Sequence, residues 1–323
     1  MRQQTARLAI GGALLAGCVP TDSGLPVSDP PSDATAQEFE AMPPPLLALD
    51  TGPLTDSDVL AQHYQRLQNS LLVQGLLRQD GGGPDTPFTA ESLADDFINI
   101  ALLPDTSFRR QEMHSFTPLH RWQQPLRMSV EFGASVPAEQ QEADRARIAR
   151  YGARMARLTG LTVQPSGPAL ANFTVLILNE AERLASETRI RALLPEISLS
   201  VLRDILNPPR RISCLVVADF EPGRATYNQA VVIIRAELPD LLRQTCIHEE
   251  IAQGLGLPND SAQAYPSIFN DNDEFGFLTT HDEMLLQMLY DPRLSPGMTY
   301  DNAVPIIRQI AAELTGTDLG TTE

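Results

Sequence analysis

The sequence predicts one α+β domain in which helices back a mixed β-sheet. Short apolar runs bounded by Gly, Pro and polar residues indicate strands, and apolar residues at helical spacing indicate amphipathic helices. From residue 125 onward these patterns come in the order strand, long helix, strand, strand, strand, helix, which suits a mixed sheet with helices packed on it. Hydrophobic residues make up 42% of the 323 residues, enough for a substantial core.

The expected elements follow one another along the second half of the chain. A strand at 125–132 precedes a long helix that opens at 135–137 and runs through Leu158, where Gly160 is a typical terminator. The remaining elements are a strand at 172–178, a helical stretch at 180–206 that breaks near Pro195, strands at 212–220 and 229–235, and a helix at 239–255.

Residues 1–17 have the pattern of a signal peptide, because arginines precede an apolar run that is too short to cross a bilayer of roughly 30 Å. The run ends in Leu-Ala-Gly before Cys18, which resembles the lipobox of bacterial lipoproteins. We therefore expect a lipid anchor on Cys18 and a periplasm-facing place in the cell envelope. An ordinary secretory signal peptide is the alternative. Because Val19 follows the cysteine, the resemblance favours the outer over the inner membrane.

The rest of the chain divides into a tether, an accessory segment, a main domain and a tail. Residues 18–53 are rich in Pro, Ser, Asp and Thr and are expected to form a disordered tether. Residues 54–118 are expected to be a helical accessory segment, with helices at 56–77 and 89–103. The main domain is expected at 119–310 and a flexible tail at 311–323.

The charge of the chain argues against nucleic acid as a partner. The 41 acidic residues outnumber the 24 basic ones and give a formal net charge of −17. No basic cluster stands out along the sequence, so a polyanion would be repelled. The partner that the sequence predicts most directly is the membrane, through the lipid anchor on Cys18.

The stretch 246–260 carries the clearest chemical pattern. His248-Glu249 suggests the zinc motif H-E-x-x-H, but its second ligand would then be Ala252. A shift by one residue fills the five fixed positions of the metzincin pattern H-E-x-x-H-x-x-G-x-x-H with Glu249, Glu250, Gln253, Gly256 and Asn259.

The resemblance to metzincins continues downstream. Residues 267–270, Ser-Ile-Phe-Asn, resemble the methionine turn beneath the metal, with Phe269 in place of Met, and residues 278–290 are similar to the final helix of those enzymes. The likeness covers residues 125–290 and implies a zincin-like fold: a mixed sheet packed on a long helix and an active-site helix, with a small C-terminal helical part. The chain also resembles a family of uncharacterised proteobacterial lipoproteins with the signature Glu-Glu-x-x-Gln-x-x-Gly-x-x-Asn-Asp.

In a zincin, two histidines at i and i+4 bind Zn²⁺ and the glutamate between them polarises the bound water. Here Glu249, Gln253 and Asn259 take the ligand positions, and Glu250 remains as a vestigial general base. Amide oxygens are poor zinc donors, so no cofactor is expected beyond weak binding of a divalent ion such as Ca²⁺, Mg²⁺ or Mn²⁺. The candidate ligands of such an ion are Glu249, Asp260 and His248.

Two cysteines remain if Cys18 is lipidated. In an exported chain, Cys214 and Cys246 are expected to pair, and two buried free thiols are the alternative. His248 points about 100° away from Glu249 on the helix, which favours a packing role. His281 is expected to cap the last helix, with a role as distal partner of the motif as the alternative.

Three functions fit these patterns. The preferred one is a pseudopeptidase that binds an extended peptide or an envelope protein without hydrolysing it. Its binding residues would be Glu249, Gln253, Asn259 and Asp260, with Phe269 as the floor. The second is an active metallohydrolase with an oxygen-rich metal site. The third is a structural lipoprotein in which the same side chains form a polar network that ties the helix to the sheet.

Overall fold

The computed structural model describes residues 14–16, 55–103, 116–220 and 224–317. The predicted tether and Cys18 lie outside these residues. Within the described ranges, no helix combines the length and the apolar character that a membrane span requires.

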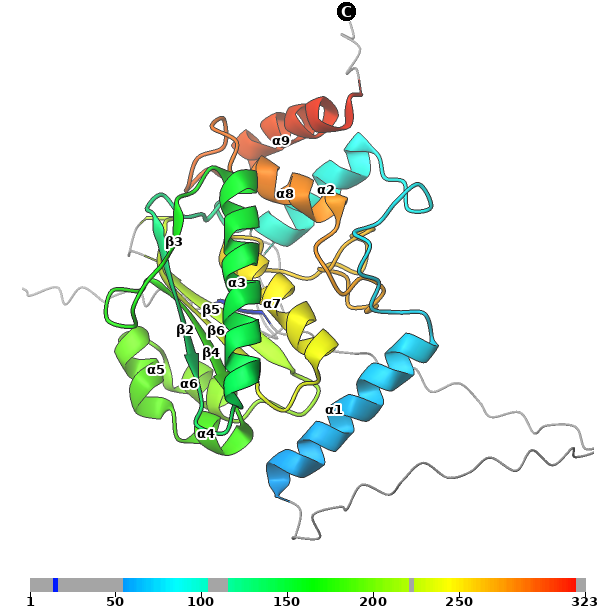
Figure 1. The fold of residues 1–323 in the computed structure, drawn as a ribbon. Helices are drawn as coiled ribbons and strands as arrows, with labels where there is room; N and C mark the ends of the chain where they lie inside the picture. Colours follow the sequence, from blue (N-terminus) through cyan, green and yellow to red (C-terminus); the bar gives the residue numbers. More distant parts are fainter. Residues whose placement is uncertain (1–13, 17–54, 104–115, 221–223, 318–323) are drawn as a thin grey trace, which may run out of the picture.

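A mixed sheet forms the centre of the protein (Figure 1). Its strands are β1 (Leu14–Ala16), β2 (Leu126–Phe132), β3 (Val163–Pro165), β4 (Phe173–Leu178), β5 (Cys214–Phe220) and β6 (Tyr227–Arg235). Over the described residues, the order across the sheet is β1-β5-β6-β4-β2-β3. The strands from β6 to β3 are parallel, whereas β5 is antiparallel to β6 and β1 is antiparallel to β5. The predicted mixed sheet is confirmed.

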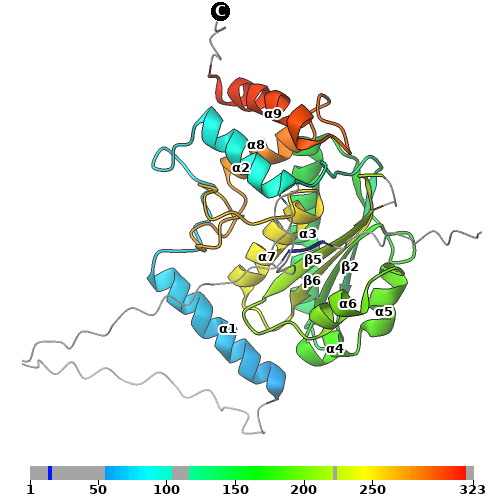
Figure 2. The same cartoon turned by 180° about the vertical axis from the view of Figure 1, so that it is seen from behind.

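Helices cover both faces of the sheet, as Figures 1 and 2 show. One face packs on α3 (Ala138–Thr159) and α7 (Asp240–Gly254), and the other packs on α5 (Glu187–Leu193) and α6 (Leu199–Leu206), next to the short α4 (Glu180–Leu184). All six residues of β4 are buried, because alternate side chains enter different cores. This explains why its sequence is a continuous apolar run.

The long helix α3 begins and ends close to its predicted limits. Ile148, Tyr151 and Met155 form its buried stripe, at the spacing that places side chains on one helical face. Gly160 ends the helix in the left-handed conformation, with φ of 72°. This helix contacts α7, which carries the first part of the 246–260 motif and packs on β5 and β6.

The remaining helices are α1 (Asp56–Val73), α2 (Ala90–Leu102), α8 (Thr280–Leu289) and α9 (Tyr300–Thr315). Capping boxes at Thr55, Thr89 and Thr279 fix the first residues of α1, α2 and α8. Helix α2 packs against α8 and α9 (Figure 2), and apolar residues of α1 and α2 belong to the same core as the sheet. The segment predicted as an accessory layer thus shares the main core.

The end of α1, strand β3 and the end of α9 differ from the predictions. Helix α1 ends at Val73 rather than near residue 77, because Gly75 and Leu77 adopt positive φ values of 77° and 60°. Strand β3 was not expected, since three residues carry too little pattern. The tail predicted from residue 311 is wrong in its first residues, because α9 continues to Thr315 and buries Ala311 and Ala312.

Candidate functional site

Helix α7 carries the motif and is fixed to the sheet by a disulfide. The structure joins Cys214 of β5 to Cys246 of α7, with an S–S distance of 1.98 Å and a Cα–Cα distance of 5.9 Å. Both residues are buried, at 2% and 3% exposure. The predicted disulfide is thus present, and it joins α7 to β5, near one edge of the sheet. Glu249 and Glu250 lie about one helical turn after Cys246.

The end of α7 explains the glycines of the motif. A Cβ on Gly254 would lie 2.9 Å from the ring of Phe173, so the helix approaches β4 too closely for a larger residue. Gly256 has φ of 125°, and a Cβ there would lie 2.6 Å from His120 O. Trp122 Nε1 donates to Gly254 O at 2.9 Å and closes the helix end. The chain thus turns sharply at Gly256, where a side chain would not fit.

Glu250 is a buried carboxyl group without a partner. Its side chain is 0% exposed, and neither of its oxygens makes a hydrogen bond with any residue that the structure describes. Burial, together with the negative charges of Glu249 and Asp260, raises its pKa well above the usual value. The raised pKa disfavours the ionised form of Glu250, which is the form that a general base needs.

Gln253 connects the helix to the segment that follows it. Its Nε2 donates a hydrogen bond of 2.8 Å to Asp260 Oδ1, and its side chain is 2% exposed. The second zinc-ligand position of the pattern therefore holds an amide that donates to a carboxylate. Glu249, at 5% exposure, lies one turn before it on the same helical side.

Asn259, at the third ligand position, forms hydrogen bonds with α2. Its Nδ2 donates to Ile100 O at 3.0 Å and to Leu103 O at 2.7 Å, and its backbone N–H also donates to Ile100 O. These carbonyls lie at the end of α2, where the helix itself offers no donors. Asn259 thus caps α2.

Asp282 of α8 holds the turn at 267–269, which is predicted to resemble a methionine turn. Asp282 accepts hydrogen bonds from Ser267 Oγ at 2.6 Å and from the backbone N–H of Ile268 at 3.1 Å. Phe269 is fully buried, and its carbonyl accepts from Ser261 N at 2.8 Å. The floor residue is therefore tied to the segment that carries Asp260.

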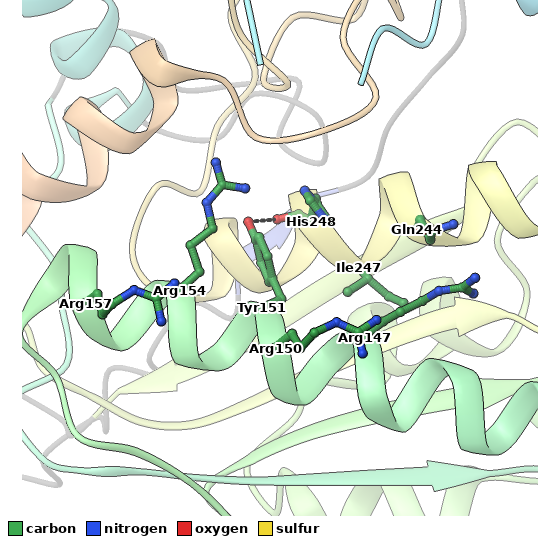
Figure 3. Close-up of a pocket in the computed structure, with 8 residues that line it drawn as sticks. All are labelled: Arg147, Arg150, Tyr151, Arg154, Arg157, Gln244, Ile247 and His248. Atoms are coloured by element: carbon green, nitrogen blue, oxygen red, sulfur yellow. Dashed lines mark hydrogen bonds between the residues drawn. The ribbon is translucent and has the colours of Figure 1, made fainter. Parts of the chain in front are cut away.

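The two motif-adjacent histidines do not join this cluster. His248 turns toward α3, where its ring stacks on Tyr151 and on Phe277 and lines a surface pocket with several arginines (Figure 3). His281 is fully buried in α8, with Nε2 3.1 Å from Asp96 Oδ2 of α2. The N-cap of α8 is Thr279, so the predicted capping role of His281 is wrong.

The structure thus divides the predicted site residues. Glu249, Glu250, Gln253 and Asp260 lie together, whereas Asn259 caps α2 and His248 faces the pocket beside α3. Among the described residues, no three or more His, Cys, Asp or Glu side chains are grouped so that they could hold a metal ion. The predicted ligand set that included His248 is therefore not assembled.

Sequence reasoning missed the arginines of α3. Arg147, Arg150, Arg154 and Arg157 lie on one side of the helix and line the same pocket as His248. Their spacing of three, four and three residues was visible in the sequence and is the spacing of one helical face. Arginines spread over eleven residues do not look like a basic cluster until the helix brings them together.

Comparison with known proteins identifies the family. Residues 90–309, more than half of the chain, match the family described as "Protein of unknown function (DUF2927)". The matched region begins at the first residue of α2, so the helix that Asn259 caps lies within it. No curated protein and no solved structure is significantly similar to the chain. With its capped helix, its sheet and its 246–260 motif inside the matched region, the chain belongs to the DUF2927 family.

Proposed function

We propose that this protein is a lipid-anchored envelope protein that binds an extended peptide segment without hydrolysing it, on a zincin-like scaffold. The sheet with one antiparallel strand beside the motif helix supports the scaffold. The raised pKa of Glu250 and the engagement of Gln253 and Asn259 by protein groups support the absence of hydrolysis.

The outer edge of β5 is the observation that carries the binding proposal. Leu14–Ala16 pairs antiparallel with β5, with Leu14 opposite Ala218 and Ala16 opposite Val216. Strand β1 belongs to the predicted signal peptide. Removal of that peptide would leave β5 as an edge strand with unpaired backbone groups, which is the feature that strand-adding peptides use.

The direction of the backbone groups of β5 follows from one hydrogen bond. Arg235 N donates to Ser213 O, so the odd-numbered residues of this strand bond to β6 and the even-numbered ones direct their N–H and C=O groups outward. Ala218 is therefore one of the residues that would bond to an added strand. Proline is tolerated at such positions, because the lost N–H faces outward.

The test uses the chain from residue 18 onward, a fluorescent peptide with the sequence of residues 11–17, and fluorescence anisotropy. The protein should bind the peptide, Ala218→Pro should weaken binding roughly tenfold by loss of a backbone donor, and Ala218→Ser should bind as the wild type does. Equal affinities for the Pro and Ser variants would contradict addition at this edge. Chelator-sensitive cleavage of the peptide would favour the metallohydrolase.

The anchoring part of the proposal rests on Cys18 and has its own test. Acyl chains supply the membrane affinity of a lipoprotein, so Cys18→Ser should abolish palmitate labelling and leave the protein soluble or unprocessed. Equal labelling of wild type and variant would contradict the anchor.

A structural role for the motif is favoured by the contacts of Asn259. This residue joins the end of α2 to the segment after α7, over more than 150 residues of chain. The role is compatible with peptide binding at β5, because the two use different parts of the molecule.

A further inference from the structure

A pocket of about 270 Å³ opens between α3 and α7 (Figure 3). Four arginines of α3 line one side: Arg147, Arg150, Arg154 and Arg157. Residues of α7, including Gln244 and His248, line the other. No Asp or Glu belongs to the lining, although acidic residues outnumber basic ones in the chain by 41 to 24. The pocket is thus a cationic site on an acidic protein.

Two of the arginines are held by carboxylates. Arg147 makes a two-pronged contact with Asp240, at 2.5 and 3.0 Å, and Arg154 Nε donates to Glu283 Oε1 at 2.7 Å. These pairs fix the guanidinium groups and offset part of their charge. They form the rigid part of the site.

The other two arginines carry uncompensated charge. Arg150 and Arg157 are exposed, and neither side chain has an ion-pair or hydrogen-bond partner among the residues that the structure describes. They are seven residues apart, so they project from nearly the same side of α3, about 10 Å apart along its axis. Arg154 lies between them. Within the described part of the chain, the pocket therefore offers two guanidinium groups without a partner on one surface.

His248 adds a neutral donor to the site. Its Nδ1 accepts a hydrogen bond from Leu278 N at 3.1 Å, so the neutral ring carries its proton on Nε2. Burial and the charge of Arg154 lower its pKa to about 3, which keeps the ring uncharged at neutral pH. Stacking between Tyr151 and Phe277, at centroid distances of 4.3 and 4.5 Å, holds the ring in place.

We propose that this pocket binds a small phosphate-type anion, such as pyrophosphate or a phosphomonoester. The guanidinium fork matches phosphate oxygens in geometry, and two uncompensated cations match the charge of about −1.5 to −2 on a phosphomonoester at neutral pH. The size of the pocket fits a compact ligand rather than an extended chain. The site is separate from the β5 edge and does not depend on the proposed peptide binding.

The test is titration of the full-length protein with inorganic pyrophosphate by calorimetry at low ionic strength. The variant R150Q/R157Q should lose roughly tenfold or more in affinity, because charge-assisted hydrogen bonds are removed. The variant R203Q/R211Q removes two exposed arginines elsewhere and should change affinity by less than about twofold. Circular dichroism checks that all three proteins are folded.

A second arm separates free phosphates from lipid headgroups. Flotation with vesicles of phosphatidylcholine, with and without phosphatidic acid, should show a preference for phosphatidic acid that R150Q/R157Q abolishes if the headgroup is the source. Pyrophosphate binding without this preference assigns the site to a free phosphate compound. Failure of the wild type to bind pyrophosphate and phosphatidic acid, equal binding by R150Q/R157Q, or binding of an oligo-aspartate peptide in preference to pyrophosphate would overturn the proposal.

Discussion

The side-chain amide of Asn259 donates a 2.7 Å hydrogen bond to Leu103 O, just beyond the last residue of α2. The third ligand position of the metzincin pattern therefore stabilises a helix from a distant part of the chain. The same amide also bonds to Ile100 O, which additionally accepts from the backbone N–H of Asn259. Asn259 thus acts as a helix cap in this protein.

We expect Asn259→Ala to lower the free energy of unfolding by about 1–3 kcal/mol, because two side-chain hydrogen bonds of about 0.5–1.5 kcal/mol each are lost. Chemical denaturation measures the change. Asn69→Ala is the matched control, because Asn69 is exposed on α1 and should contribute no more than about 0.5 kcal/mol. Equal losses in the two variants would show that Asn259 does not cap α2.

The sequence predicted the local elements well and the distant contacts poorly. Helix α7 and the turn around Gly256 follow from periodicity and from glycine, which are local properties. The partner of Asn259 is the carbonyl of a residue 156 positions earlier, and no short pattern records such a contact. The burial of Glu250 has the same origin, because it depends on which segments close over the helix.

The disulfide gives a second prediction. Replacement of Cys214 and Cys246 by Ser should lower the free energy of unfolding by about 3 to 4 kcal/mol. This is the stabilisation expected when a cross-link joins residues 32 positions apart and so restricts the unfolded chain. Unfolding in denaturant measures it. Dithiothreitol should destabilise the wild type by a similar amount and leave the double Ser variant unchanged. Two titratable thiols at these positions in the unreduced, denatured protein would contradict the pairing.

Glu250 gives a third prediction, on pH. Its folded pKa is raised above the ordinary value of 4.5, so above that pH the folded state holds a proton that the unfolded state has released. The contribution of this group to the free energy of unfolding is fully present below pH 4.5 and is lost as the pH rises through the folded pKa. Between the two pKa values, the free energy of unfolding falls by up to about 1.4 kcal/mol per pH unit. Glu250→Gln should remove this loss, so the variant should gain stability relative to the wild type from pH 5 to pH 8.

The control for Glu250 is a carboxyl group shifted the other way. Hydrogen bonds from Arg293 lower the pKa of Glu313, so its contribution is present above the ordinary value and is lost as the pH falls. Glu313→Gln should therefore give no gain in relative stability toward pH 8. Denaturation midpoints across the pH range report both trends. A pH-independent difference for Glu250→Gln would mean that this carboxyl group is ionised in the folded protein.

The last prediction contrasts His248 with His281. Burial and the charge of Arg154 lower the pKa of His248 to about 3. Burial also opposes protonation of His281, but the carboxylates of Asp282 and Asp96 outweigh it and raise the pKa of that ring. In ¹H–¹³C spectra of the folded protein, the His281 ring signal should begin to shift first as the pH falls from 8, while the His248 signal stays constant to about pH 4. In the unfolded state this histidine binds a proton near pH 6.5, whereas in the folded state it stays neutral down to about pH 3. The free energy of unfolding should therefore decrease as the pH falls from about 6.5 toward 3. Assignment uses the variants His248→Gln and His281→Gln, each of which should remove one signal. A His248 signal that titrates near pH 6.5 would mean that its ring is open to solvent and is not held between Tyr151 and Phe277.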